Sequence, residues 1–171
     1  MRLFIAINFE KETKNKLLSL RDELRAVSSS GNFSLPENIH LTLVFLGECD
    51  HKQTAAVKKA MDMVFFEPFD MRIERLGRFR RDDGDLWWVG VQESKPLLDL
   101  QRNLTDLLGQ HVKGIAIDKR KYSPHITLGR KVEADVNPRQ IEPFGETVGQ
   151  VDLMKSERIN GKLTYTAIYT I

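Results

Sequence analysis

Two short motifs contain the residues that could perform chemistry. The chain carries His40-Leu41-Thr42-Leu43 and, roughly half a chain length later, His125-Ile126-Thr127-Leu128. Both motifs lie in segments that read as β-strands, in which alternate side chains point to the same face. Each histidine therefore shares a face with its threonine. An imidazole beside a hydroxyl can hold a phosphate and move a proton, and two such pairs supply a general acid and a general base.

The remaining histidines and the single cysteine form no recognisable site. His51 follows Cys49 in a turn before a predicted helix, where we expect a solvated side chain. His111 lies at the end of another predicted helix, where an imidazole interacts favourably with the helix dipole, so we interpret it as structural. The sequence has no CxxC, HExxH or glycine-rich phosphate motif. We therefore expect metal-free chemistry.

Basic residues flank the second motif on both sides. The run Lys119–Lys121 precedes it, and Arg130 and Lys131 follow it. Cations beside a strand that holds a phosphate favour a polyanionic partner. Arg130 is the first candidate for such a phosphate contact.

Two further features are candidates for nucleic-acid contact. Trp87 and Trp88 could stack on bases, but strand alternation places them on opposite faces, so at least one belongs to the core. Arg78, Arg80 and Arg81 precede an acidic turn, and we interpret them as a solvated hairpin loop.

The composition is that of an ordinary globular protein. With 171 residues, 41% hydrophobic and 29% charged, the chain is long enough to bury one core, and we expect a single domain over residues 1–171. A net charge of +2 permits a nucleic-acid partner without requiring one. One cysteine excludes an internal disulfide and fits a reducing compartment. No apolar run approaches the roughly 20 residues of a membrane span, so we expect a cytoplasmic protein.

Hydrophobic periodicity predicts a mixed α and β chain in two related lobes, each contributing one His-x-Thr strand. Short polar turns are expected at Ser29–Asn32 and at Asn160-Gly161. The predicted helices are Lys11–Ser28, residues 50–65 opened by a capping box of Asp50 and Gln53, and Pro96–His111 with Leu97, Leu100, Leu104 and Leu107 buried. The predicted strands are Arg2–Asn8, Asn38–Leu46, Phe69–Leu76, Leu86–Gln92, Pro124–Lys131, Thr147–Ser156 and Leu163–Ile171.

The two motif segments resemble a known family. IHLTLVFLGE (Ile39–Glu48) and SPHITLGR (Ser123–Arg130) are similar to the paired signatures of the two-histidine (2H) phosphoesterases. More narrowly, they resemble the RNA 2′,3′-cyclic phosphodiesterases, historically called 2′-5′ RNA ligases. Arg2–Ile7 matches the first strand of that branch, and Trp88–Gly90 and Ser156–Tyr165 fall where similar elements occur in it. The resemblance covers essentially the whole chain.

This resemblance implies an α+β, bilobal 2H phosphoesterase fold with pseudo-two-fold symmetry. Two antiparallel β-sheets would face a central cleft, with the helices packed outside. The implied reaction is metal-independent hydrolysis of a terminal 2′,3′-cyclic phosphate of RNA to a 2′-phosphomonoester, with no cofactor. By position, His40 would be the proton donor and His125 the proton acceptor, while Thr42 and Thr127 would hydrogen-bond the nonbridging oxygens. Predicted substrate-binding residues are Arg130, Phe45, Tyr122 and Arg120.

The expected partner is RNA with 2′,3′-cyclic phosphate ends, bound by a monomer, with no membrane or protein partner implied. One alternative keeps the superfamily but makes the protein a 2′-5′ RNA ligase or a phosphodiesterase of small cyclic nucleotides. Another is a non-catalytic module that binds RNA or nucleotides. A binder would lose affinity through lysine and arginine changes and tolerate a His→Gln exchange, whereas the enzyme would behave the other way round. The intact quartet of two histidines and two threonines favours the enzyme.

Overall fold

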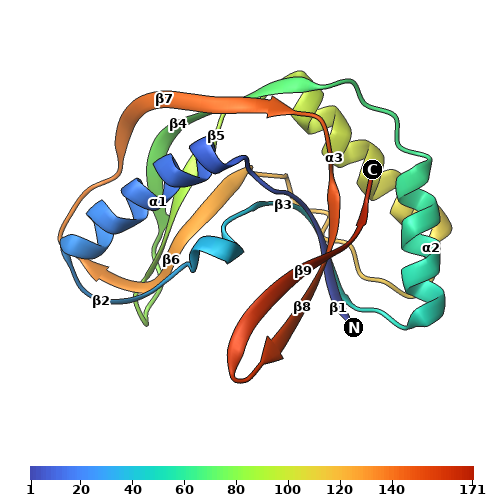
Figure 1. The fold of residues 1–171 in the computed structure, drawn as a ribbon, viewed down its shortest axis with the longest axis horizontal. Helices are drawn as coiled ribbons and strands as arrows, with labels where there is room; N and C mark the ends of the chain where they lie inside the picture. The colour runs from blue at the N-terminus through green and yellow to red at the C-terminus, as the bar shows by residue number, and fades with distance from the viewer.

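The computed structural model, which describes residues 1–171, contains helices and strands and ends in four consecutive strands (Figure 1). The helices are α1 (Lys11–Ala26), η1 (Pro36–Asn38, a 3-10 turn), α2 (His51–Asp62) and α3 (Lys95–His111). The strands are β1 (Arg2–Ile7), β2 (Ser28–Phe33), β3 (Leu41–Glu48), β4 (Phe69–Phe79), β5 (Asp85–Val91), β6 (His125–Ala134), β7 (Arg139–Val148), β8 (Asp152–Ile159) and β9 (Lys162–Thr170).

The strands form two antiparallel sheets, which confirms the expected α+β class. One sheet has the order β3-β1-β8-β9 and the other the order β2-β6-β5-β4-β7. The first motif strand, β3, is therefore the edge of its sheet, whereas the second, β6, lies between β2 and β5. Helix α1 packs against the five-stranded sheet, and α2 and α3 pack against each other at the opposite end of the molecule (Figure 1). No helix is long and apolar enough to cross a membrane.

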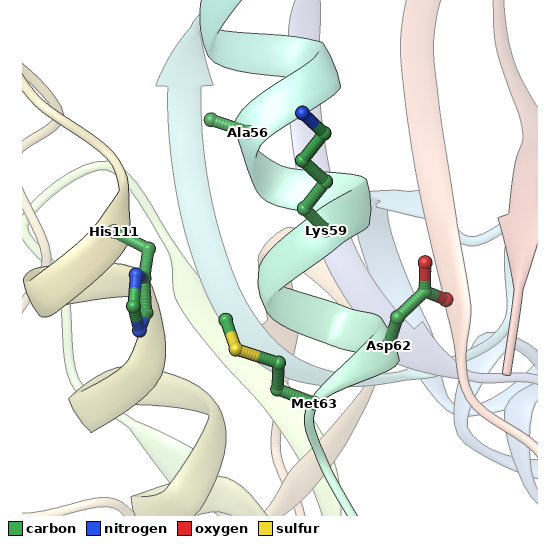
Figure 2. A pocket seen from close by; sticks show the side chains of 5 residues that line it. All are labelled: Ala56, Lys59, Asp62, Met63 and His111. Carbon is green, nitrogen blue, oxygen red and sulfur yellow. The ribbon is translucent and has the colours of Figure 1, made fainter.

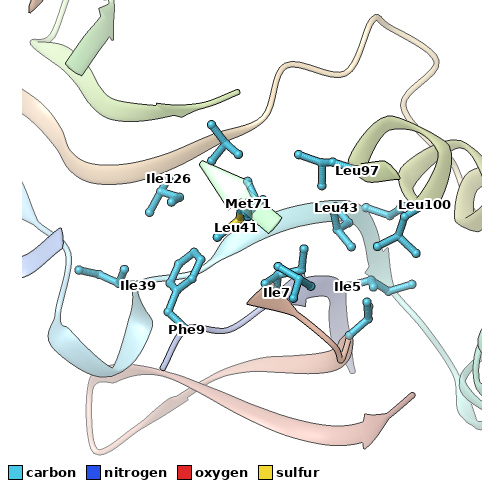
Figure 3. Close-up of a cluster of buried hydrophobic side chains, with 14 of the residues drawn as sticks. Ile5, Ile7, Phe9, Ile39, Leu41, Leu43, Met71, Leu97, Leu100 and Ile126 are labelled. Atoms are coloured by element: carbon cyan, nitrogen blue, oxygen red, sulfur yellow. The ribbon is translucent and has the colours of Figure 1, made fainter. Parts of the chain in front are cut away.

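The main hydrophobic core is shared by the two sheets and the helices α1, α2 and α3. Figure 3 shows Leu41 and Leu43 of β3 among side chains from β1, β4, β6 and α3. Strand β1 contributes every second residue to this core, and the residues between them, Phe4 and Ala6, form a separate small cluster with Met154. Because successive side chains of a strand point to opposite faces, Phe4 lies on the face of β1 away from the main core, beside the His40 ring.

Local signals position the helices as expected. The Asp50 carboxylate accepts a hydrogen bond from the backbone N–H of Gln53 at 2.7 Å, and the Gln53 side chain accepts one from the Asp50 N–H at 2.9 Å. This confirms the capping box that begins α2. In α3 the buried side is Leu97, Leu100, Leu104 and Leu108. Leu107, predicted to be buried, is only partly buried, because a turn of 3.6 residues brings Leu108 rather than Leu107 onto that side.

Two of the predicted turns and strands were wrong. Ser29–Asn32 is not a turn but belongs to β2, which pairs with β6. This exposed edge strand has no hydrophobic alternation to predict it, and its hydrogen bonds come from β6. The predicted strand Thr147–Ser156 is the end of β7 and most of β8. Strand β7 contains Pro143, which is tolerated because β7 is an edge strand. The predicted Asn160-Gly161 turn is confirmed, since both residues have the positive φ of a tight hairpin.

Candidate active site

The two motif histidines are oriented in the same way. Nδ1 of His40 lies 2.7 Å from the backbone carbonyl of Asn38, and Nδ1 of His125 lies 2.7 Å from that of Ser123. A carbonyl oxygen can only accept a hydrogen bond, so Nδ1 carries the proton in both rings. In the neutral tautomer Nε2 is then left as the basic nitrogen. Both rings therefore present Nε2 for chemistry.

The His40 ring is half-buried among aromatic side chains. It lies 4.9 Å from the Phe4 ring and meets the Tyr165 ring edge-on at 5.3 Å, measured between centroids. Burial lowers the pKa of His40, the hydrogen bond to Asn38 partly offsets this, and the positive charge of Arg130 lowers the pKa further. The neutral imidazole is thus favoured in the free protein. Arg130 belongs to the other sheet, so its influence shows that the two motif strands contribute to one electrostatic environment.

His125 has an equivalent aromatic surrounding in its own sheet. Its ring lies 5.4 Å from Phe79, edge-on, and 6.1 Å from Trp88. The Trp88 indole packs against Gly77 of β4, where an added Cβ would overlap the ring. Trp87 points the other way into the main core, which confirms that the two tryptophans lie on opposite faces.

The threonines accompany the histidines as the alternation predicts. The hydroxyl oxygen of Thr42 lies 2.8 Å from Nε2 of His40. Thr127 is half-buried on β6, next to Trp88 of β5 in the register of the sheet. Each sheet therefore presents one imidazole and one hydroxyl, as the sequence predicted.

Both motif strands contain a β-bulge at the same position. In β3, Ile5 pairs with Val44 and Ala6 with Thr42, so Leu43 is the extra residue. In β6, Trp87 pairs with Gly129 and Trp88 with Thr127, so Leu128 is the extra residue. A bulge reverses the alternation beyond it, because two residues occupy the place of one.

The bulges turn Phe45 and Arg130 to the face of the histidines. Strict alternation would bury both in the core, yet Phe45 is 63% exposed and Arg130 is exposed. Phe45 lies opposite Phe4 in the register of β1 and β3, with the two ring centroids 6.3 Å apart. The Phe45 ring in β3 and the Arg130 guanidinium in β6 thus occupy equivalent positions, each just after the bulge of its motif strand.

The two other predicted substrate-binding residues have partners within the protein. Tyr122 donates its hydroxyl to the backbone carbonyl of Thr42 at 2.8 Å, and burial raises its pKa. Arg120 is exposed and forms an ion pair with Asp118 at 2.6 Å. The structure brings Tyr122 to the motif and shows no contact between Arg120 and either histidine.

Residues outside the motifs are placed as follows. His51 is exposed, as predicted, and His111 is exposed in the last turn of α3. His111 borders a hollow between α2 and α3 that contains no motif residue (Figure 2). Arg78 was wrongly predicted to be solvated: it donates to the Val136 carbonyl at 2.9 Å and lies over the Trp87 ring. No group of three or more His, Cys, Asp or Glu side chains could hold a metal ion.

Sequence reasoning missed the aromatic rings that enclose the histidines. Phe4, Tyr165 and Phe79 come from strands distant in sequence from the motif that each one supports. Phe4 and Tyr165 lie in segments noted for their family resemblance, which was the available signal.

A family model described as the 2′-5′ RNA ligase superfamily matches residues 19–160. The chain belongs to this superfamily. Its relatives include the RNA 2′,3′-cyclic phosphodiesterase of Archaeoglobus fulgidus, 31% identical over 85% of this chain and 85% of that protein. The protein of the same name from Thermotoga maritima is 31% identical over 76% of this chain and 70% of its own length.

Solved structures of the superfamily have the same fold. Escherichia coli LigT complexed with 3′-AMP superposes with a TM-score of 0.85, covering 99% of this chain and 96% of that one at 24% sequence identity. Likeness at this identity shows the fold alone, and it confirms the expected 2H phosphoesterase architecture.

Proposed function

We propose that this protein hydrolyses terminal 2′,3′-cyclic phosphates of RNA to 2′-phosphomonoesters, using His40 and His125 as acid and base. The observation that carries the proposal is the matched orientation of the two imidazoles. Each has Nδ1 fixed on a carbonyl, which leaves Nε2 as the nitrogen that can take up or release a proton. The superfamily membership and the relatives named RNA 2′,3′-cyclic phosphodiesterase support the choice of substrate.

The reaction breaks one P–O bond and forms another. Nε2 of His125 accepts a proton from a water molecule as the water oxygen attacks phosphorus. The bond between phosphorus and the 3′-oxygen breaks, and its electron pair stays on that oxygen. His40 gives the departing oxygen a proton from Nε2, leaving a free 3′-hydroxyl and a 2′-phosphomonoester. General acid or base catalysis of this kind contributes typically about 10²–10⁴-fold each.

His40 can act as the acid despite its lowered pKa. In the free protein burial favours the neutral ring. The negative charge of a bound phosphate favours the imidazolium, so substrate binding would promote protonation of His40 at Nε2. His40 would later donate this proton to the leaving oxygen. Because burial makes the imidazolium a stronger acid, the same environment assists the proton transfer.

The remaining site residues would hold the substrate. Thr42 and Thr127 would donate hydrogen bonds to the nonbridging oxygens, and Arg130 would stabilise their negative charge. We propose that the exposed ring of Phe45 stacks on a nucleobase, because it shares the face of His40 and Phe4. The structure offers less support for substrate contact by Tyr122 and Arg120, since both already have partners in the protein.

The experiment is an incubation of chelator-treated protein with a short RNA ending in a 2′,3′-cyclic phosphate, followed by identification of the terminal phosphate. A 2′-phosphate is expected. A 3′-phosphate would retain the chemistry of the two histidines but exchange the leaving oxygen, which would overturn the acid and base assignment. Absence of product with RNA and with small cyclic nucleotides would leave the non-catalytic binding module as the function.

A further inference from the structure

The carbonyl groups at the two bulges receive hydrogen bonds from outside their own strand. In the first lobe β3 is an edge strand, and the Thr42 carbonyl accepts the hydroxyl of Tyr122 at 2.8 Å. In the second lobe the Thr127 carbonyl accepts the hydroxyl of Ser34 at 2.9 Å, and the Leu128 carbonyl accepts the backbone N–H of Ser34 at 2.8 Å. Each motif threonine stands just before its bulge, and its backbone carbonyl accepts a hydrogen bond from a hydroxyl elsewhere in the chain.

The two hydroxyls cross between the halves of the chain. Tyr122 lies in the segment that runs into His125, yet it binds the strand of His40. Ser34 lies in the segment that runs into His40, yet it binds the strand of His125. The arrangement is reciprocal: the approach to each motif holds the threonine of the other.

We infer that Tyr122 and Ser34 are positioning residues that fix the two His-x-Thr strands relative to each other. We call these two hydrogen bonds the crossed clamp. The inference rests on the proposed function, because it assigns the clamp to the reaction that the two histidines perform. Two catalytic groups on different sheets must be held together, and a displacement of about 1 Å can cost about 100-fold in rate.

Both donors are themselves well fixed. The Tyr122 side chain is partly buried against the main core, and this burial raises its pKa, so it stays a hydroxyl donor. The Ser34 carbonyl accepts a hydrogen bond from the Arg21 guanidinium of α1 at 2.8 Å. The core therefore anchors the donor to Thr42, and α1 anchors the donor to Thr127.

The effect on the site passes through the bulges. The Thr42 side chain contacts Nε2 of His40, and its carbonyl belongs to the peptide that leads into bulged Leu43. The bulge in turn directs Phe45 to the site. Loss of the Tyr122 hydrogen bond would free this peptide and loosen the packing of His40, whereas loss of the Ser34 hydrogen bond would act on Thr127 and Arg130.

The first test compares Tyr122→Phe with Tyr169→Phe. The Tyr169 hydroxyl donates to Asp62 away from the motifs, so the control also removes one tyrosine hydroxyl. We expect kcat per folded molecule to fall about tenfold or more in Tyr122→Phe, with KM changed by less than about twofold, and no such loss in the control. Equal kinetics in the two variants would overturn the inference for Tyr122.

A titration of His40 by NMR separates positioning from a mere loss of folded protein. In Tyr122→Phe, looser packing should admit water and move the pKa of His40 up toward the ordinary imidazole value. Arg130, the charged group whose field reaches His40, is unchanged in this variant. Tyr169→Phe should titrate like the wild type. If wild-type protein fails to hydrolyse cyclic phosphates, the proposed function fails, and an unchanged His40 titration in Tyr122→Phe would then overturn the clamp as well.

The second half of the clamp has its own matched pair. Ser34→Ala removes the hydroxyl bound to Thr127 of β6. Ser29→Ala removes another hydroxyl bound to β6, since Ser29 donates to the Glu133 carbonyl at 3.2 Å. We expect kcat to fall in Ser34→Ala without a change in the His40 titration, and Ser29→Ala to resemble the wild type. Identical kinetics in the two serine variants would show that Ser34 does not position the second motif.

Discussion

Nε2 of His40 lies 2.8 Å from the hydroxyl oxygen of Thr42. While the imidazole is neutral, Nε2 accepts the threonine proton, because Nδ1 is already committed to the Asn38 carbonyl. When the imidazole is charged, Nε2 donates instead, and the threonine proton is released for another acceptor. The charge of His40 therefore decides whether Thr42 can donate to an anion.

Anion binding should be coupled to protonation of His40. The pKa of His40 is lowered in the free protein, and a bound anion should raise it, because both the anion charge and the released Thr42 proton favour the imidazolium. Affinity for sulfate, whose charge stays constant over this pH range, should therefore fall as pH rises through the pKa of His40 in the complex. Calorimetric titration of sulfate at several pH values, together with NMR titration of His40 with and without sulfate, measures this. A sulfate affinity independent of pH, together with a His40 pKa that does not change, would contradict the coupling.

Each motif histidine should be essential for turnover but not for folding. We expect His40→Ala and His125→Ala each to lower kcat by about 10²–10⁴-fold while the circular dichroism spectrum and Tm stay near those of the wild type. His51→Ala and His111→Ala are matched controls, because both side chains are exposed outside the site. Near-wild-type turnover in either motif variant would end the acid–base mechanism.

Arg130 should act on both the substrate and His40. Removing its charge in Arg130→Gln should raise the pKa of His40, since that charge lowers it in the wild type. It should also reduce kcat/KM by about ten- to 100-fold, because a charge-assisted contact to the phosphate is lost. Lys131→Gln is the control: Lys131 is the neighbouring exposed cation and faces Asp83. Steady-state kinetics and NMR titration of both variants test this, and equal behaviour would remove Arg130 from the site.

Phe45 should matter only when the substrate carries a base. Stacking of a base on an aromatic ring contributes about 1–3 kcal/mol, so Phe45→Ala should lower kcat/KM about five- to 150-fold on a nucleoside 2′,3′-cyclic phosphate. The same variant should be unaffected on a ribose 2′,3′-cyclic phosphate without a base. Phe65→Ala removes an 80% exposed phenylalanine elsewhere and should change neither rate. Equal losses on both substrates would show that Phe45 supports the site in another way.

Much of the site could be predicted from local sequence. The pairing of each histidine with its threonine needs only the two-residue period of a strand, and the beginning of α2 needs only the Asp50 and Gln53 capping box. The exposure of His51 and the turn at Asn160-Gly161 likewise follow from neighbouring residues in the sequence. These features depend on neighbours along the chain, which the sequence lists in order.

The rest depends on partners distant in sequence. The bulges at Leu43 and Leu128 exist only in the register with β1 and β5, and they decide that Phe45 and Arg130 face the histidines rather than the core. Strand β2 is held by β6 rather than by any pattern of its own, and the hydroxyls of Tyr122 and Ser34 reach carbonyls in the opposite half of the chain. The sequence by itself thus determined that each motif histidine shares a strand face with its threonine. Only the tertiary structure decided which side chains join them, because a strand's alternation can be reset by a hydrogen-bonding partner that no local pattern reveals.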